Sequence, residues 1–269
     1  MRSHNPVLTR LTPETQVGRR DADVARYPGG AGYSTEAGYQ SSVVAPAEAE
    51  RMTVDDVVVR TVGLLALTGL SGAAAWIIVP DRVAPAFWIG AAMVGLIIGL
   101  VIAFKQITNP LLIGAYAVVE GVFVGLVSKA YEAAFDGIVL QAVIGSFGVF
   151  FLMAILYKSR VIRATPTFIK WVTGALIGVV AIIVINFVIS LFGVNTHLRD
   201  GSPLAIGFSL LVIGVAALTF ILDFHQVEEG VRQGLPERYA WLSAFGILVG
   251  LIWLYLEILR LLSYLRGND

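Results

Sequence analysis

Three acidic residues of this chain, Glu120, Asp223 and Glu257, stand inside or at the end of long apolar runs. If those runs cross a bilayer, an ionised side chain near the middle costs roughly 2.5–3.5 kcal/mol on insertion scales. Such a residue is not needed for insertion, so embedded carboxylates are candidates for function by default. Asp223 and Glu257 are the first two candidates, and Glu120 is the third.

Two carboxylates that face each other in a low dielectric cannot both ionise cheaply, so the pair is expected to hold a proton and to titrate as one unit. Protonation removes their repulsion and allows a shared-proton hydrogen bond. Deprotonation separates the groups or attracts a hard cation, and oxygen ligands suit Ca²⁺. Asp223 and Glu257 are therefore predicted to form a pH sensor and gate for a cation path, with Ca²⁺ as the transported ion that their oxygens could bind.

Structural explanations compete with each of these roles. Glu257 and Arg260 are neighbours on one helix face and could neutralise each other. Asp223 could be solvated at a helix end, and Glu120 could be protonated and hydrogen-bonded to a facing helix. A weaker prediction assigns a pore or a proton path to the remaining polar groups, which are Glu120, Asn186, His225 and Arg260.

The elements that must position these groups are membrane helices. A bilayer core about 30 Å thick needs about 20 helical residues to span it, and the backbone of a span must satisfy its own hydrogen bonds. The fold class predicted is an all-α integral membrane protein with a seven-helix bundle. The predicted spans are Val57–Val79, Ala86–Phe104, Leu111–Tyr131, Ile138–Tyr157, Trp171–Phe192, Leu204–Leu222 and Trp241–Leu262.

Local signals support these boundaries. Thr53 is a candidate N-cap for the first helix, with Asp56 three residues further on. Pro residues fall in the breaks between spans, where helices stop or start. Residues 1–50 form a different region, rich in Gly, Tyr and Pro without an apolar period, and are predicted to be a disordered tail. Residues 51–269 are the predicted transmembrane domain.

The overall composition agrees with a membrane protein. Hydrophobic residues make up 57% and charged residues 14% of the chain, against roughly 45–50% and about 25% in soluble domains. The net charge is zero, so no bulk attraction for nucleic acid is expected. Cysteine is absent, which excludes disulfides and thiolate chemistry. No cofactor and no catalytic residue are predicted.

Orientation and packing follow from Lys, Arg and Gly. The loop Lys158–Lys170 carries most of the positive bias, which predicts a cytoplasmic N-terminus and an outside C-terminus in the cell membrane. Four Gly-xxx-Gly steps predict close helix packing, and several on separate helices favour a tight monomer over a dimer. These steps are Gly95/Gly99, Gly121/Gly125, Gly174/Gly178 and Gly246/Gly250.

Two segments resemble the Bax inhibitor-1 family, also called the transmembrane BAX-inhibitor-motif proteins. They are Leu222-Asp-Phe-His-Gln-Val and Leu254-Tyr-Leu-Glu-Ile-Leu, and the resemblance covers roughly residues 50–266. It implies a seven-helix fold and a pH-sensitive Ca²⁺ leak, with Asp223 and Glu257 as the pH-sensing pair. The second acid is Glu where the family has Asp, and the tail has no apparent counterpart, which suggests a divergent bacterial branch.

Other functions remain open at this point. A proton-coupled transporter of small solutes would use Glu120 with the same two acids, although no inverted repeat is evident. A non-transporting membrane partner, for instance a modulator of a protease or a stress response, would use the tail or the glycine faces. An enzyme is the weakest alternative, because the chain lacks a His-Glu-x-x-His helix and has no histidine deep inside a span.

Overall fold

A computed structural model describes residues 50–193 and 196–267. Within these ranges the chain forms seven α-helices and no strand, and each helix is long and apolar enough to cross a membrane. The predicted tail falls outside the described residues except at its last position. The helices are α1 (Val54–Ile78), α2 (Ala84–Lys105), α3 (Pro110–Ala134), α4 (Ile138–Lys158), α5 (Pro166–Leu191), α6 (Pro203–Arg232) and α7 (Tyr239–Gly267).

Helix starts follow the local sequence signals. Thr53 caps α1 in a capping box with Asp56, as predicted, and side chains also cap α3, α5 and α6. Pro occupies the first turn of α2, α3, α5 and α6, where its missing N–H costs nothing.

Each helix is longer than its predicted span, and α6 exceeds its prediction the most. Helix α5 begins at Pro166 rather than Trp171, and α6 continues to Arg232 rather than ending at Leu222. The prediction that the sixth helix ends at Leu222 was therefore wrong, since Asp223 lies inside α6. Hydropathy falls where charged residues begin, but the backbone leaves the helix only near Gly234, which has a φ of 66°, and Pro236.

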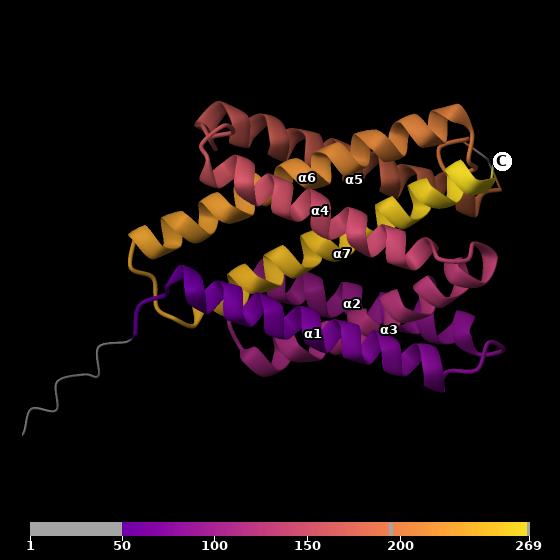
Figure 1. The fold of residues 1–269 in the computed structure, drawn as a ribbon, viewed down its shortest axis with the longest axis horizontal. Helices are drawn as coiled ribbons and strands as arrows, with labels where there is room; N and C mark the ends of the chain where they lie inside the picture. Colours follow the sequence, from indigo (N-terminus) through magenta and orange to yellow (C-terminus); the bar gives the residue numbers. More distant parts are fainter. Residues whose placement is uncertain (1–49, 194–195, 268–269) are drawn as a thin grey trace, which may run out of the picture. The chain divides into compact units, whose positions relative to one another are not determined.

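Helix α7 lies at the centre of the bundle. It packs against α1, α3, α4 and α6, and it runs between a group made of α1, α2 and α3 and another made of α4, α5 and α6 (Figure 1). Helix α5 makes its substantial contacts with α6 alone. Side chains on α7 therefore meet most of the other helices.

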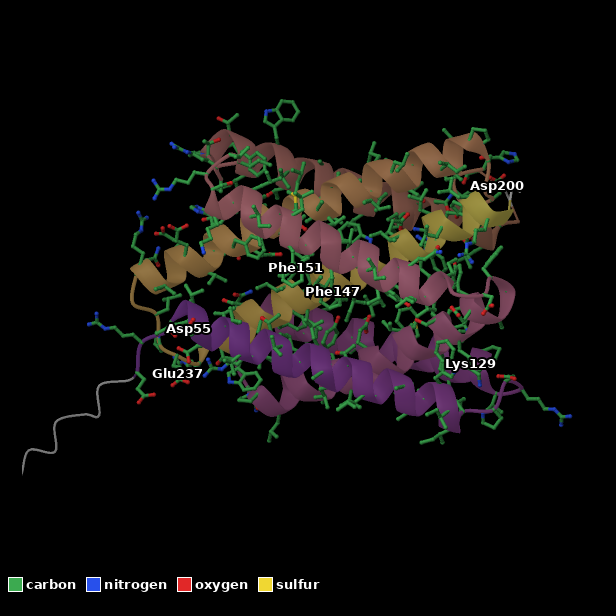
Figure 2. The ribbon with its side chains drawn as sticks, viewed as in Figure 1. Asp55, Lys129, Phe147, Phe151, Asp200 and Glu237 are labelled. Atoms are coloured by element: carbon green, nitrogen blue, oxygen red, sulfur yellow. The ribbon has the colours of Figure 1, made fainter. Side chains whose placement is uncertain are left out.

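The two ends of the bundle carry the charges. The end that holds the start of α1 is called the N-side, and the end that holds the finish of α7 the C-side. Figure 2 shows Asp55 and Glu237 at the N-side and Lys129 and Asp200 at the C-side, with apolar side chains between them. Because charged groups avoid hydrocarbon, this pattern sets the bundle across a lipid bilayer.

A polar clamp at the N-side holds the start of α7. Arg60 of α1 pairs with Glu237 and Asp56 and lies over the ring of Trp241. The backbone N–H of Met52 donates to the carbonyl of Leu235 over 2.8 Å. The short loop between α6 and α7 is thereby tied to α1, which fixes the entry of α7 into the bundle.

Glycines allow one very close helix crossing. A Cβ added to Gly125 or Gly121 of α3 would collide with α1 at Gly72 or Thr68, and Gly95 and Gly99 of α2 meet Glu120 and Tyr116. By contrast, a Cβ on Gly174 or Gly178 of α5 would have open space. The predicted tight packing thus holds for the steps on α2 and α3 and fails for the step on α5.

Candidate functional site: the acids along α7

Glu257 is the most enclosed charged residue among those described. It lies on α7 with 2% of its surface exposed. The Ser209 hydroxyl of α6 donates to Oε1 over 2.9 Å, and Nη1 of Arg260 donates to Oε2 over 2.5 Å. The i,i+3 spacing places Glu257 and Arg260 on one helix face, and both carboxylate oxygens thus have partners.

Asp223 has a different environment. It faces α7 at Gly250, where an added Cβ would lie 3.7 Å from its Oδ2. Phe220, one turn earlier on α6, packs against the same glycine. Within residues 50–193 and 196–267, Asp223 makes no hydrogen bond or ion pair. The lack of a side chain at Gly250 allows Phe220 and Asp223 to pack closely against α7.

The structure does not bring the two acids into hydrogen-bond contact. Asp223 is level with Gly250, whereas Glu257 lies seven residues further along α7, a rise of about 10 Å. Their helices run in opposite directions, so Asp223 lies toward the N-side and Glu257 toward the C-side. At this separation the two carboxylates do not share a proton in this conformation. The sequence did not predict the separation, because the pattern of apolar runs does not fix the register of α6 against α7.

The other candidate residues are dispersed. Glu120 of α3 lies against Gly95 of α2, and His225 interacts electrostatically with Glu229 near the N-side end of α6. Asn186 of α5 donates to the Thr196 hydroxyl. Only Arg260 joins one of the two leading acids. A single continuous path through all of the predicted residues is not evident in the part of the chain that the structure describes.

Three hydroxyl residues near the inner face of α7 were not predicted from the sequence, because the prediction rested mainly on charged groups inside apolar runs. Ser209 binds Glu257, and the hydroxyls of Ser128 and Tyr255 lie 2.6 Å apart where α3 meets α7. All three are hydroxyl residues within spans, and polar groups there tend to face other helices rather than lipid. Hydroxyl residues within the spans therefore indicate which faces of α6 and α7 point toward other helices.

Two cations, Arg199 and Arg260, interact with the single negative charge of Glu257. Arg199, in the loop between α5 and α6, interacts electrostatically with Arg260 and Glu257. Desolvation first, and then the Arg260 guanidinium, lowers the pKa of Arg199. The two guanidiniums therefore share one carboxylate on the C-side of the bundle.

No group of three or more His, Cys, Asp or Glu residues that could hold a metal occurs in the described part of the chain. Ca²⁺ takes six to eight oxygen ligands, which two separated carboxylates do not supply.

Comparisons with known proteins place the fold and these residues in a family. No curated protein matches the sequence. The family model described as "Bax inhibitor 1 like" matches residues 5–267. This range begins well before the region of resemblance at about residue 50, so the statement that the tail has no counterpart was wrong. The match covers nearly the whole chain, and the protein therefore belongs to the Bax inhibitor 1 like family.

Proposed function

We propose that this membrane protein is a pH-sensitive cation leak channel for Ca²⁺, and that Glu257 on α7 is its principal gate. The observation that carries the proposal is the ion pair of a carboxylate that is 2% exposed with Arg260. An embedded charge pair is costly to keep in an apolar bundle and marks a functional site. Membership of the Bax inhibitor 1 like family supports the same reading.

The gate works through charge. While Glu257 is ionised, Arg260 and Ser209 occupy both of its oxygens, so a cation that reaches it meets a neutralised group. Protonation of Glu257 cancels the attraction to Arg260 and releases the guanidinium toward the C-side. Because α7 packs against four other helices, a change at this position affects both groups of helices.

Asp223 acts as a second interaction site for the cation. It lies nearer the N-side, beside Gly250, and has no hydrogen bond or ion pair within the described residues. An ionised carboxylate that has no counter-charge attracts a cation that leaves water. In this proposal the two acids sense pH and ions separately, at two levels along α7, and not as one hydrogen-bonded pair. The N-side faces the cytoplasm of the cell, in keeping with the excess of Lys and Arg there.

The test is Ca²⁺ efflux from phosphatidylcholine liposomes that contain the purified full chain, scanned from about pH 5 to about pH 8, which brackets physiological pH. The wild type should leak faster at acid pH. Glu257→Gln, which mimics the protonated acid, should leak at neutral pH as the wild type does at acid pH. Asp223→Asn should reduce the flux and flatten its pH dependence.

The control is Glu229→Gln. Glu229 is an acid of α6 that binds Arg232 and Gln233 at the N-side end of the helix, away from α7's inner face. This variant should keep the wild-type leak and pH profile. The proposal fails if no leak occurs at any pH, or if the Glu257 and Asp223 variants both behave as the control does.

A further inference from the structure

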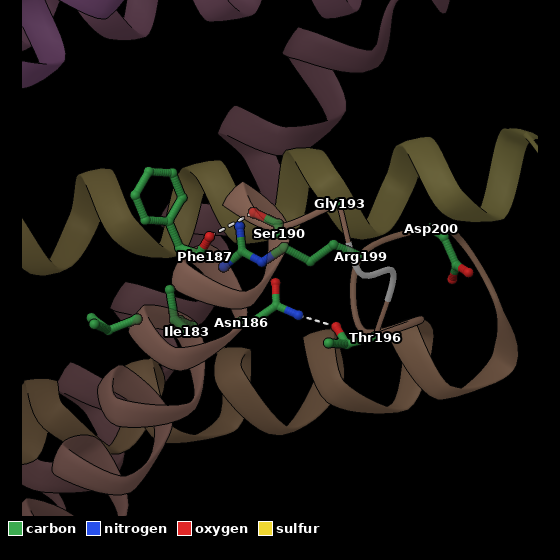
Figure 3. A pocket seen from close by; sticks show the side chains of 9 residues that line it. Ile183, Asn186, Phe187, Ser190, Gly193, Thr196, Arg199 and Asp200 are labelled. Atoms are coloured by element: carbon green, nitrogen blue, oxygen red, sulfur yellow. Dashed lines mark hydrogen bonds between the residues drawn. The ribbon is translucent and has the colours of Figure 1, made fainter.

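A second polar site lies on the C-side, between the end of α5 and the loop that follows it. Here a cavity of about 620 Å³ opens beside Asn186, Ser190, Thr196 and Arg199. Figure 3 shows the Arg199 side chain reaching back from the loop toward α5, whereas the Asp200 carboxylate points away from it. The cavity is thus lined by one cation, by one acid whose carboxylate points away from that cation, and by neutral polar groups.

The lining of this cavity changes from polar to apolar along α5. Ser190 lies nearest the loop, Asn186 and Phe187 are one turn deeper, and Ile183 and Val184 are one turn deeper again. From Ser190 to Ile183 the helix rises about 10 Å. A ligand that fits both ends must have a polar head at the bilayer surface and an apolar part directed toward the middle.

The polar end favours an anion. Arg199 makes no hydrogen bond or ion pair within residues 50–193 and 196–267. Its electrostatic neighbours include the cation Arg260 and the carboxylate of Glu257, which is already paired with Arg260. The Asp200 carboxylate already accepts from His197 Nδ1 and from the backbone N–H of Ser202. The Thr196 hydroxyl accepts from Asn186 and so retains its own proton for donation.

The apolar end is open to lipid. Val184 and Phe187 are 53% and 62% exposed, and α5 has substantial contacts with α6 alone. In a bilayer these side chains are covered by acyl chains, because no other helix of the described chain covers them. The membrane lipids that surround the protein are therefore amphiphiles of the required shape, and they are always present next to this cavity.

We propose that this cavity binds one anionic phospholipid of the C-side leaflet. Its phosphate is held by the Arg199 guanidinium and the Thr196 hydroxyl, and its acyl chain lies along Val184 and Phe187. Guanidinium groups bind phosphate through paired, charge-assisted hydrogen bonds. No residue of α7 lines this cavity, although Arg199 interacts electrostatically with Glu257 and Arg260. The proposal does not depend on transport of any ion.

Native mass spectrometry of the full chain tests the proposal, with phosphatidylglycerol and phosphatidylcholine as probes. The wild type should retain one phosphatidylglycerol more strongly than phosphatidylcholine. Arg199→Gln should lower that retention by about tenfold, the usual order for losing a hydrogen bond to a charged group. Arg199→Lys should restore part of it, and Ser190→Phe, which narrows the polar end of the cavity without changing charge, should also lower it.

Arg82→Gln is the matched control, because Arg82 is an exposed cation on the same C-side in the loop between α1 and α2. It should retain the lipid as the wild type does. Equal retention by Arg199→Gln and wild type, or equal retention of the two lipids, would overturn the proposal. Excess inorganic phosphate should leave the lipid bound, and its displacement by phosphate would show instead a site for a soluble anion.

Discussion

Helices α7 and α5 look alike in the sequence and differ strongly in how much of each is buried. Both are long apolar helices with a few polar residues, and α5 is the more hydrophobic of the two. In their most apolar stretches 61% of α7 is buried inside the protein, against 11% of α5. In water the more apolar helix would be the buried one. In lipid, which is as apolar as leucine, polar and small residues determine which faces meet other helices.

This contrast predicts that substitutions around α7 disturb the protein and that matched substitutions on or near α5 do not. The largest effect should come from Arg260→Leu, which leaves the enclosed Glu257 carboxylate without its cation. Loss of one partner of a buried pair costs about 3–5 kcal/mol. The free energy of unfolding in mixed detergent micelles measures it.

Two further variants sharpen this result. The double substitution Glu257→Leu with Arg260→Leu should recover most of the stability, because no unpaired charge remains. Arg199→Leu, which removes a cation without an ion pair in the described chain, should cost much less. If Arg199→Leu were as damaging as Arg260→Leu, the distinction between the α7 and α5 environments would be lost.

The next largest effect concerns glycine. Gly125→Ala should destabilise the bundle by about 1–3 kcal/mol, as overpacking does, because the new methyl group meets the backbone of α1 at Gly72. Gly178→Ala on α5 has open space and should change stability by less than about 0.5 kcal/mol. The same unfolding measurement applies, and equal effects of the two alanines would contradict the packing described here.

A smaller effect is expected from the hydrogen bond between Ser128 and Tyr255, 2.6 Å long. A double-mutant cycle of Ser128→Ala and Tyr255→Phe should give a coupling of about 0.6 kcal/mol, the average for hydrogen bonds between membrane helices. On α5, the Ser190 hydroxyl bonds to Phe187 within its own helix. A cycle that pairs Ser190→Ala with Tyr255→Phe should therefore show no coupling.

The smallest effect should be at Asp200, in the loop after α5. The hydrogen bond from His197, followed by that from the Ser202 backbone, lowers the pKa of Asp200 to about 2. A depressed folded-state pKa means that stabilisation is present above the unfolded pKa of about 3.9 and is lost as the pH falls toward about 2. Asp200→Asn should therefore lower the melting temperature slightly at pH 6, and the difference should shrink on acidification. A constant difference down to about pH 2 would contradict the assignment.

Much of the architecture could be predicted from local patterns. Seven apolar runs, the prolines between them and the Thr53 cap predict seven helices because each signal acts within one turn or one span. The sixth helix was cut short at Leu222 because hydropathy records the membrane boundary, whereas backbone geometry near Gly234 ends the helix. The family follows from short motifs around Asp223 and Glu257, and these also lie within single helices.

The site was harder to predict because its contacts are long-range. Nothing near Glu257 in the sequence points to Ser209, which lies 48 residues away. Similarly, the close packing of Asp223 against α7 depends on Gly250 of another helix. The pairing of Glu257 with Arg260 was recognised as an alternative, since residues three apart on a helix are neighbours in any fold that keeps the helix.

The sequence by itself determined that this protein is a seven-helix membrane bundle with carboxylates inside its spans. That follows because each span must satisfy its own backbone in lipid, whatever surrounds it. Only the tertiary structure decided that α7 is the central helix, that the two acids lie at different levels along it, and that α5 turns its glycines outward. Those features depend on the register and rotation of one helix against another, and hydropathy carries no information about either.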